Sequence, residues 1–488
     1  MTDATSEAPL RVAVIGGGLT GLAATLRLAE RLPAAELTLF ESSNRVGGVL
    51  ETVERDGFLI ERSADNFLTK EPWALDFCRQ LGLEDELLPT NEERRRALVV
   101  RAGRVVPAPE AFVLMAPKRL GPLMRSPVLS PWGKLRLACE PLVPRRNGSA
   151  ASTVDESVAS FARRRLGREA FERLVQPLLA GIYTADPERL SMAATMPQFV
   201  EQERTHGSLL RASLAEQKRQ RQAQREDPSH RESGARYGLF RAPKRGMQQL
   251  IDSAERALPG GCVRFGQRVQ SVRREQGKWI VDTGEESSGY DAAIVTTPAH
   301  AAAGLLKEAS GDLERELAAI EYAGCSVVCL GFRQEQLPSL PTGFGFVVPS
   351  IEGRQIIAAS FSSLKFPGRA PGDGLLVRVF VGGALQPGLA ELADEELTRI
   401  ARSELSELVG VRGEQVLSEI ARWPRAMPQY HVGHLDRVDR IERLVAGLPG
   451  LEVAGAAYRG VGMPQCIRDG QQAADRIAEH AKSLGAAG

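Results

Sequence analysis

A glycine-rich turn between two apolar runs constrains this chain more than any other feature. The first apolar run, residues 12–15, leads into three consecutive glycines and Gly21, and a second run after a helical pattern ends at Glu41. This order predicts a β-α-β unit whose glycines allow a tight turn and a close approach of the backbone to a pyrophosphate. The N-terminus of the helix adds free N–H groups and partial positive charge. Glu41, about twenty residues beyond the last glycine, is placed to hold ribose hydroxyls, so an adenine dinucleotide is expected here.

A second pair of glycines narrows the choice of cofactor. The segment Arg45-Val46-Gly47-Gly48 follows the acid. It is similar to the second fingerprint of the two-dinucleotide-binding-domain flavoproteins, whose loop continues along the FAD pyrophosphate. A domain that binds only a nicotinamide cofactor has no need of this loop, so FAD is the expected cofactor. The predicted contacts in this unit are Gly16, Gly17, Gly18, Leu19, Thr20, Gly21, Glu41, Ser42, Arg45, Gly47, Gly48 and Val49.

Length and composition set the class of protein. A chain of 488 residues is too long for one compact core, so two or three domains are expected. The net charge of +1 argues against a general nucleic-acid binder. The six cysteines form no C-x-x-C pair, which fits a reducing compartment. The polar N-terminus is no signal peptide and no apolar run approaches the ~20 residues that span a bilayer, so a cytoplasmic protein is expected. Peripheral attachment to the inner face of the cell membrane stays open.

The order of the predicted elements indicates a discontinuous cofactor domain. Nucleotide-binding character appears at both ends of the chain and in its middle, with a helical stretch and a β-rich stretch between. The predicted fold class is α/β, with an FAD-binding Rossmann-like domain of the amine-oxidase type, an inserted mixed β-sheet substrate domain and an inserted helical domain. The predicted parts are FAD-binding 11–90, 237–300 and 421–485, helical and substrate-tunnel 91–210, a flexible charged loop 211–236, and substrate-binding 301–420.

Five further segments, in order along the chain, resemble one family. They are residues 172–191, 360–367, 381–383, 422–434 and 454–467. Together they are similar to the porphyrinogen oxidases of the monoamine-oxidase and phytoene-desaturase superfamily, and the resemblance covers about residues 11–480. The last two segments are most similar to the coproporphyrinogen III oxidase branch, with the protoporphyrinogen oxidases as the alternative. Two positions depart from the family pattern: Ser63-Ala64 stands where Gly-Pro is usual, and Ala185 stands where glycine is usual.

The resemblance implies an activity and its partners. A porphyrinogen of haem biosynthesis would be oxidised to the porphyrin in three two-electron steps, and oxygen would reoxidise the flavin with release of hydrogen peroxide. Ferrochelatase and a second copy of the chain are candidate partners, and the helical insertion is a candidate for membrane contact. The resemblance adds predicted cofactor contacts at Asp65, Asn66, Val269, Thr297, Trp423, Gly455, Ala456, Val461, Gly462 and Met463.

The expected chemistry depends on positioning, since no acid–base dyad is evident. Asn66 is predicted to be the catalytic residue that orients the substrate, with a turn-stabilising asparagine as the alternative. Phe346 and Phe361 are predicted to sandwich a tetrapyrrole ring, with core packing as the alternative, and Gly181 is predicted to line the pocket. Arg95, within the run of arginines at 94–96, is the predicted anchor for a propionate, although such a run is more often a solvated face.

Further residues near the C-terminal end are candidates for the flavin site or for a metal site. Trp423, Met427 and Tyr430 are predicted to wall the isoalloxazine. His431 and His434 suggest a metal pair, but no third ligand is evident and no metal is expected.

Residues 111–125 mix apolar and basic side chains and suit either a membrane interface or the substrate tunnel.

Three other functions stay open. A flavin amine oxidase, for which only Tyr458 stands in the aromatic positions of the C-terminal motif, is one alternative. A desaturase, or a flavin-binding protein without turnover, are the others.

Overall fold

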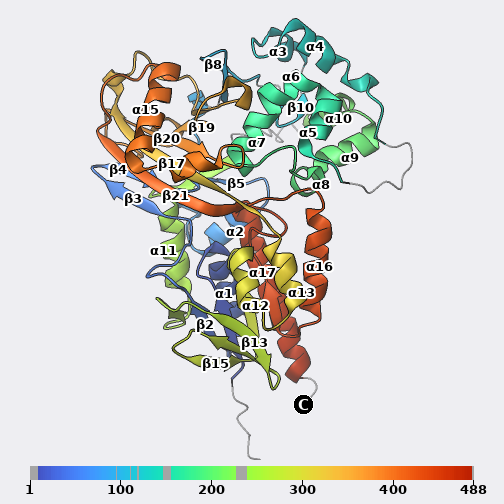
Figure 1. Cartoon of the computed structure of the whole chain (residues 1–488), viewed down its shortest axis with the longest axis vertical. Helices are drawn as coiled ribbons and strands as arrows, with labels where there is room; N and C mark the ends of the chain where they lie inside the picture. Colours follow the sequence, from blue (N-terminus) through green and yellow to red (C-terminus); the bar gives the residue numbers. More distant parts are fainter. Residues whose placement is uncertain are drawn as a thin grey trace, which may run out of the picture.

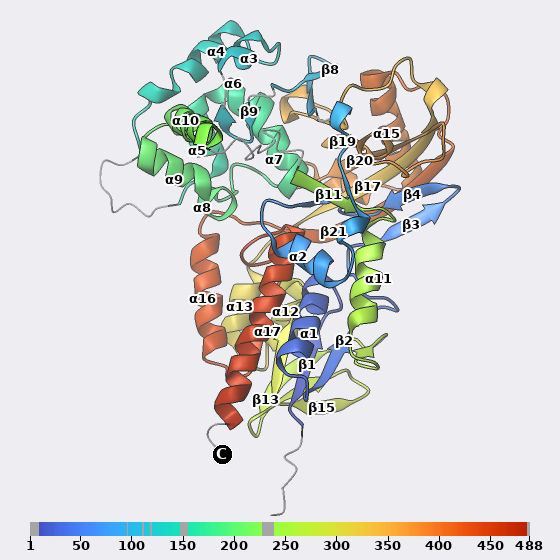
Figure 2. The same cartoon turned by 180° about the vertical axis from the view of Figure 1, so that it is seen from behind.

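The computed structural model describes residues 9–94, 96–109, 112–117, 120–146, 155–226 and 239–485. It has three parts: a nucleotide-binding domain, a seven-stranded sheet above it, and a group of helices beside that sheet (Figure 1). The last helix of the chain runs alongside the first, so both ends of the sequence meet in the nucleotide-binding domain (Figure 2). The predicted α/β fold with an inserted sheet and inserted helices is confirmed.

Three distant stretches of chain build the nucleotide-binding domain. Its central parallel sheet contains β1 (Arg11–Ile15), β2 (Glu36–Phe40), β12 (Val263–Arg264), β16 (Ala292–Val295) and β22 (Leu451–Val453), in the order β12-β2-β1-β16-β22. Its helices are α1 (Leu19–Arg31), α2 (Trp73–Gln80), α11 (Met247–Ala257), α12 (Ala299–Leu306), α13 (Gly311–Ala318), α16 (His434–Ala446) and α17 (Met463–Gly485). The antiparallel strands β13 (Ser271–Glu275), β14 (Lys278–Asp282) and β15 (Ser287–Tyr290) complete it.

Helices and strands cover both faces of the central sheet, which explains the unbroken apolar run in β1. Val12 and Val14 pack in one core with residues of α1, α11 and α17. Ala13 and Ile15 point the other way and pack in a second core with residues of α12, α13 and α16. The alternation of a strand thus sends successive side chains of one short segment into two separate cores.

The second large sheet is mixed. It contains β7 (Leu98–Arg101), β8 (Arg104–Pro107), β17 (Tyr322–Arg333), β18 (Gly345–Val347), β19 (Ala358–Phe361), β20 (Gly374–Gly382) and β21 (Leu417–Pro428), in the order β21-β17-β20-β19-β18-β7-β8. Helix α15 (Asp394–Val409) covers one face. The other face meets the hairpin of β3 (Thr52–Arg55) and β4 (Phe58–Glu61). Below it lie β5 (Phe67–Leu68), β6 (Leu87–Pro89), β11 (Phe240–Pro243) and α14 (Ser362–Lys365).

The structure moves three of the predicted domain boundaries. Helices α12 and α13 pack on the nucleotide-binding sheet, so the β-rich part begins near β17 and not at residue 301. Strands β7 and β8 were predicted within the helical part, but β7 pairs in parallel with β18 and joins the seven-stranded sheet. The predicted flexible loop 211–236 begins as helix α10 (Leu209–Glu226), and residues 227–236 lie outside the described residues.

The helical domain, residues 120–226 in the described part, holds a core of its own. Its larger helices are α4 (Pro131–Ala138), α5 (Val158–Leu166), α7 (Gln176–Tyr183), α9 (Pro197–His206) and α10. Shorter elements in and beside it are β9 (Phe112–Val113), β10 (Ala116–Pro117), α3 (Leu120–Arg125), α6 (Arg168–Ala170) and α8 (Met192–Thr195). Helix α7 packs against the seven-stranded sheet at β18, so the helical domain is in contact with that sheet.

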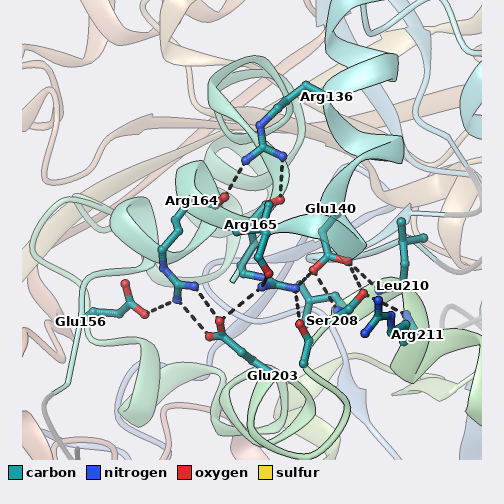
Figure 3. Close-up of polar contacts among 12 residues, drawn as sticks. Arg136, Glu140, Glu156, Arg164, Arg165, Glu203, Ser208, Leu210 and Arg211 are labelled. Atoms are coloured by element: carbon teal, nitrogen blue, oxygen red, sulfur yellow. Dashed lines mark hydrogen bonds and ion pairs between the residues drawn. The ribbon is translucent and has the colours of Figure 1, made fainter. Parts of the chain in front are cut away.

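A buried ionic network joins these helices (Figure 3). Arg165 of α5 is fully buried and donates to Glu140. It also donates to the carbonyls of Val143 and Gly207, each at 2.9 Å. Glu140 also accepts from Ser208 Oγ and from the amides of residues 209 and 210 at 3.0 and 3.2 Å. The carboxylate therefore neutralises both a buried guanidinium and the positive N-terminus of α10.

Candidate functional site

The glycine turn after β1 is closely packed at Gly16 and Gly21 and borders free space at Gly18. A Cβ placed on Gly21 would lie 1.9 Å from the carbonyl oxygen of Gly16, so α1 contacts the end of β1 directly. Gly16 has φ +109°, and a Cβ there would lie 2.9 Å from Thr296 Oγ1. A Cβ on Gly18, in contrast, would meet nothing within 4 Å. The N-terminal amides of α1 thus border free space, as a bound pyrophosphate requires.

The second glycine pair lies against this turn. The amide of Gly47 donates to the carbonyl of Gly17 at 2.8 Å, and a Cβ on Gly48 would lie 3.3 Å from the Cα of Gly18. Arg45 donates to the carbonyls of Val46, Gly48 and Leu50 at 3.1, 2.7 and 3.0 Å. Its guanidinium therefore shapes the loop that the sequence predicts to run along the pyrophosphate. Val49, at the tip of this loop, is exposed.

Glu41 stands at the end of β2, beside the same turn. Its carboxylate accepts from the amides of Gly17 and Ser43, each at 2.8 Å, and from Ser42 Oγ at 3.4 Å. The amide of Gln267 donates to the carbonyl of Glu41 at 3.0 Å, which brings residues 267–269 alongside. The side chain of Val269 is buried in the core with Trp279, so only the backbone of this residue could reach a cofactor.

The C-terminal motif reaches the same site from the opposite direction. Gly455 follows β22 with φ +134°, and its amide donates to Asp469 at 2.7 Å. A Cβ on Gly455 would lie 3.7 Å from Thr20 Oγ1 in the first turn of α1. The loop of residues 456–462 then leads into α17 at Met463, and Val461 packs against the helical domain. Predicted cofactor residues from the two ends of the chain therefore lie together.

One buried polar atom supports a bound group at this place. Thr297 Oγ1 has no hydrogen-bond partner in the described residues although it is buried. Its methyl carbon would lie 3.3 Å from a Cβ on Gly16, so the threonine borders the glycine turn. A buried hydroxyl without a partner is costly and is usually satisfied by a ligand or water. The open space at Gly18, the carboxylate of Glu41 and this hydroxyl fit an adenine dinucleotide.

The loop with Asp65 and Asn66 is held by a buried charge cluster. Asp65 accepts from Lys365 Nζ at 3.0 and 3.1 Å and pairs with Arg378 at 3.4 Å. Burial raises the pKa of Asp65, but the two cations and Asn66 outweigh it and lower the pKa to about 2. Asn66 Nδ2 donates to Asp65, which turns the amide oxygen away from the carboxylate. Arg378 also donates to the carbonyl of Ser63, so β20 fixes the whole loop.

This cluster predicts a pH dependence of stability. The folded-state pKa of Asp65 lies below its ordinary value of 3.8, so its stabilising effect is present above about pH 4 and is lost as the pH falls toward 2. At pH 7 we expect Asp65→Asn to lower the free energy of unfolding by about 3 kcal/mol, because two buried cations lose their partner. Urea unfolding from pH 7 down to pH 3 tests this: the difference between the two proteins should begin to narrow below pH 4. A difference that is absent at pH 7, or that widens in acid, contradicts it.

The structure corrects the predicted aromatic sandwich. Phe346 and Phe361 are 1% and 0% exposed and contact each other, with ring centroids 6.1 Å apart, between the seven-stranded sheet and α15. Core side chains surround both rings, so neither offers a face to a substrate. Gly181, in contrast, is exposed on α7, where a Cβ would lie 3.7 Å from Val347 on the opposite face of the sheet.

Trp423 and Tyr430, which were also predicted to lie at the flavin, are within the described residues. Trp423 lies on β21 and its Nε1 donates to the carbonyl of Arg62 at 2.8 Å, so it supports the loop before Asp65. Tyr430 is buried in the core of the helical domain. Arg95 lies outside the described residues, and its neighbour Arg94 donates to the carbonyl of Pro341.

Two residues of β20 were missed by the sequence argument. Val377, Val379 and Val381 face α15, so Arg378 and Phe380 point to the opposite face, toward the nucleotide-binding domain. The guanidinium of Arg378 lies 5.2 Å from the ring centroid of Phe380, which is only half-buried. The signal was present in the sequence as a single charge inside an apolar strand.

Comparisons with known proteins agree with this geometry. The family model described as flavin containing amine oxidoreductase matches residues 19–478. The coproporphyrinogen III oxidase of Bacillus subtilis (strain 168) is 33% identical over 474 residues, which cover 96% of this chain and 98% of that protein. The enzyme of the same name from Staphylococcus aureus is 30% identical, with 96% and 98% covered. Protoporphyrinogen oxidase 2 of Arabidopsis thaliana is 30% identical, with 97% and 94% covered.

A solved structure is similar to this chain along its whole length. A protein of Exiguobacterium sp. 255-15, provisionally named a protoporphyrinogen oxidase, has a TM-score of 0.84 and 29% identity, with 97% of this chain and 100% of that chain covered. The predictions of an enzyme of this superfamily and of a flavin cofactor are confirmed. The chain belongs to the flavin containing amine oxidoreductase family.

Proposed function

We propose that the protein is an FAD-dependent oxidase of haem biosynthesis that converts coproporphyrinogen III to coproporphyrin III. The observation that carries this proposal is similarity along the whole chain, at 30–33% identity, to proteins named coproporphyrinogen III oxidase, together with a dinucleotide site closed from both ends of the sequence. The substrate loses six hydrogens as three hydrides and three protons, and three oxygen molecules take them up as hydrogen peroxide.

The residues divide this work. The turns at Gly16–Gly21 and Gly47–Gly48 hold the pyrophosphate, and Glu41 holds the ribose. When bound, FAD supplies a two-electron acceptor for hydride from a meso carbon of the substrate. Asn66, with its amide fixed by Asp65, presents an oxygen acceptor to the pyrrole N–H groups, and protons leave to water. Phe380 packs in one apolar cluster with Ala180 of α7, and we expect the macrocycle to contact these two elements.

Protoporphyrinogen IX is the second candidate substrate, because the plant protoporphyrinogen oxidase is also 30% identical over nearly the whole chain. Coproporphyrinogen carries four propionates and protoporphyrinogen two, so the two substrates differ mainly in charge. A side-by-side turnover assay that follows porphyrin fluorescence separates them. We expect the higher kcat/KM with coproporphyrinogen III, and equal or greater activity with protoporphyrinogen IX would overturn the choice of substrate.

We also propose that the helical domain attaches the enzyme to the membrane surface. No helix in the described residues is long and apolar enough to cross a bilayer. Trp132 and Leu142 are 80% and 78% exposed, and Leu135 on α4 and Met124 on α3 are also exposed; Lys134 lies on α4 as well. These helices form the end of the domain that faces away from the nucleotide-binding domain (Figure 1). Exposed large apolar side chains beside a basic one suit an anionic lipid surface.

Vesicle binding tests the membrane proposal. Sedimentation with phosphatidylglycerol vesicles should carry down the wild-type protein, and the variant Trp132→Ser with Leu142→Ser should bind at least about tenfold more weakly, because each buried apolar side chain contributes about 1.5–3 kcal/mol. Phe265→Ser, at an exposed apolar site of the nucleotide-binding domain, is the matched control. Equal binding of all three proteins would contradict the assignment of this surface.

Analytical ultracentrifugation with and without ferrochelatase tests the two remaining partners, a second copy and that enzyme.

A further inference from the structure

Tyr430 joins two parts of the molecule through one hydroxyl. Its side chain is 1% exposed, and its hydroxyl donates to the carbonyl of Ala456 at 2.5 Å and accepts from the amide of Gly460 at 2.9 Å. The ring stacks on His434 with centroids 4.0 Å apart and planes 13° from parallel. Burial lowers the pKa of His434 to about 4, so this partner is neutral at pH 7. The hydroxyl therefore closes the loop between β22 and α17 from the side of the helical domain.

The backbone around Tyr430 is fastened to the helical domain. The amide of Ser191 donates to the carbonyl of Tyr430 at 2.7 Å, and the amide of Val432 donates to the carbonyl of Arg189 at 2.9 Å. Asp155 accepts from the amide of Gly433 at 3.2 Å and from Ser191 Oγ at 2.5 Å. One residue thus holds the helical domain by its backbone and the cofactor loop by its side chain.

The loop needs such a partner. Gly455 and Gly460 have φ of +134° and +151°, and glycine has little preference for one conformation. The carbonyl of Ala456 and the amide of Gly460 belong to no strand or helix, so their hydrogen bonds must come from elsewhere. The tyrosine hydroxyl satisfies one donor and one acceptor four residues apart, which sets the width of the turn.

We propose that Tyr430 is a positioning residue for the flavin: its hydroxyl sets the 456–460 turn at the cofactor, and its backbone ties the shape of that turn to the helical domain. The inference rests on the proposed function only in assigning residues 455–463 to FAD. It predicts that FAD binding, measured without any substrate, depends on this single hydroxyl.

Removal of the hydroxyl tests the inference. Tyr430→Phe keeps the ring and its stacking on His434 but leaves the carbonyl of Ala456 and the amide of Gly460 without their partner. We expect the dissociation constant for FAD, measured by flavin fluorescence, to rise about tenfold, and the increase in Tm on adding FAD to shrink. Ser326→Ala is the matched control, since its buried hydroxyl on β17 donates to the carbonyl of Ala390 at 2.7 Å. This variant should lose stability with an FAD dissociation constant within twofold of the wild type.

Two results would overturn the inference. One is a Tyr430→Phe protein with a lowered Tm in the absence of FAD and an unchanged dissociation constant, because the tyrosine would then be only structural. The other comes from hydrogen exchange of the unaltered FAD-loaded enzyme, where rapid exchange of the Gly460 amide would show that the bond is not made. Failure to turn over a porphyrinogen would instead overturn the proposed function and leave both of these measurements intact.

Discussion

Replacement of Gly21 by valine is expected to give a colourless protein. The added Cβ would lie 1.9 Å from the carbonyl oxygen of Gly16 and 2.9 Å from Thr296 Oγ1. The first of these atoms is backbone, so no side chain can move to make room, and α1 must shift away from β1. The shift removes the N–H groups of α1 from the pyrophosphate position. We expect a loss of about 3 kcal/mol in FAD binding, or more than about a hundredfold in affinity, measured by the ratio of flavin to protein absorbance.

The control for this variant is Gly304→Ala on α12. A Cβ on Gly304 would meet nothing within 4 Å, so this change should leave FAD content unaltered and slightly favour the helix. A Gly21→Val protein that keeps its full complement of FAD would mean that the contact between α1 and β1 does not set the pyrophosphate site.

Replacement of Arg165 by methionine is expected to destabilise the helical domain by about 3–5 kcal/mol. The variant leaves Glu140 fully buried without the guanidinium that pairs with it, and the carbonyls of Val143 and Gly207 lose their donor. Urea unfolding followed by circular dichroism measures the loss. Arg168→Met, whose side chain is 83% exposed and pairs with Glu172 one turn away, should cost less than about 0.5 kcal/mol.

The double variant Arg165→Met with Glu140→Met separates the charge from the packing. If the uncompensated carboxylate causes the loss, removal of Glu140 as well should restore part of the stability that Arg165→Met alone loses. The same double variant also removes the carboxylate that accepts hydrogen bonds from the amides at the start of α10, which limits the recovery of stability. A single variant within about 1 kcal/mol of the wild type would contradict the view that this network holds the domain together.

The parts of the fold that depend on local chain properties were predictable. The β1–α1–β2 unit follows from an apolar run, glycines and a helical period within 30 residues, and the structure has all three elements where the pattern predicts them. The C-terminal strand and helix follow for the same reason. The stretch predicted to be β-rich, residues 301–420, holds strands β17 to β20.

The features that could not be predicted from the sequence depend on contacts between segments far apart in the chain. The period of two along β19 indicates that Phe361 and Ala359 share a face, but not that α15, more than 30 residues later, covers that face. The parallel pairing of β7 with β18 joins segments about 250 residues apart, and no local pattern reports it. Tyr430 was predicted to face the flavin because of its place in a motif, whereas its hydroxyl in fact reaches the loop of residues 456–460 from the core of the helical domain.

The most direct test of the central claim is anaerobic mixing of the FAD-loaded protein with coproporphyrinogen III. We expect the oxidised flavin band to disappear within the turnover time, coproporphyrin fluorescence to rise, and admission of oxygen to restore the band with release of hydrogen peroxide. Asn66→Ala, compared with the wild type at equal FAD content, should slow the bleaching. A flavin that stays oxidised in the presence of excess coproporphyrinogen III, and of protoporphyrinogen IX in a parallel sample, would contradict the claim that this protein is a porphyrinogen oxidase.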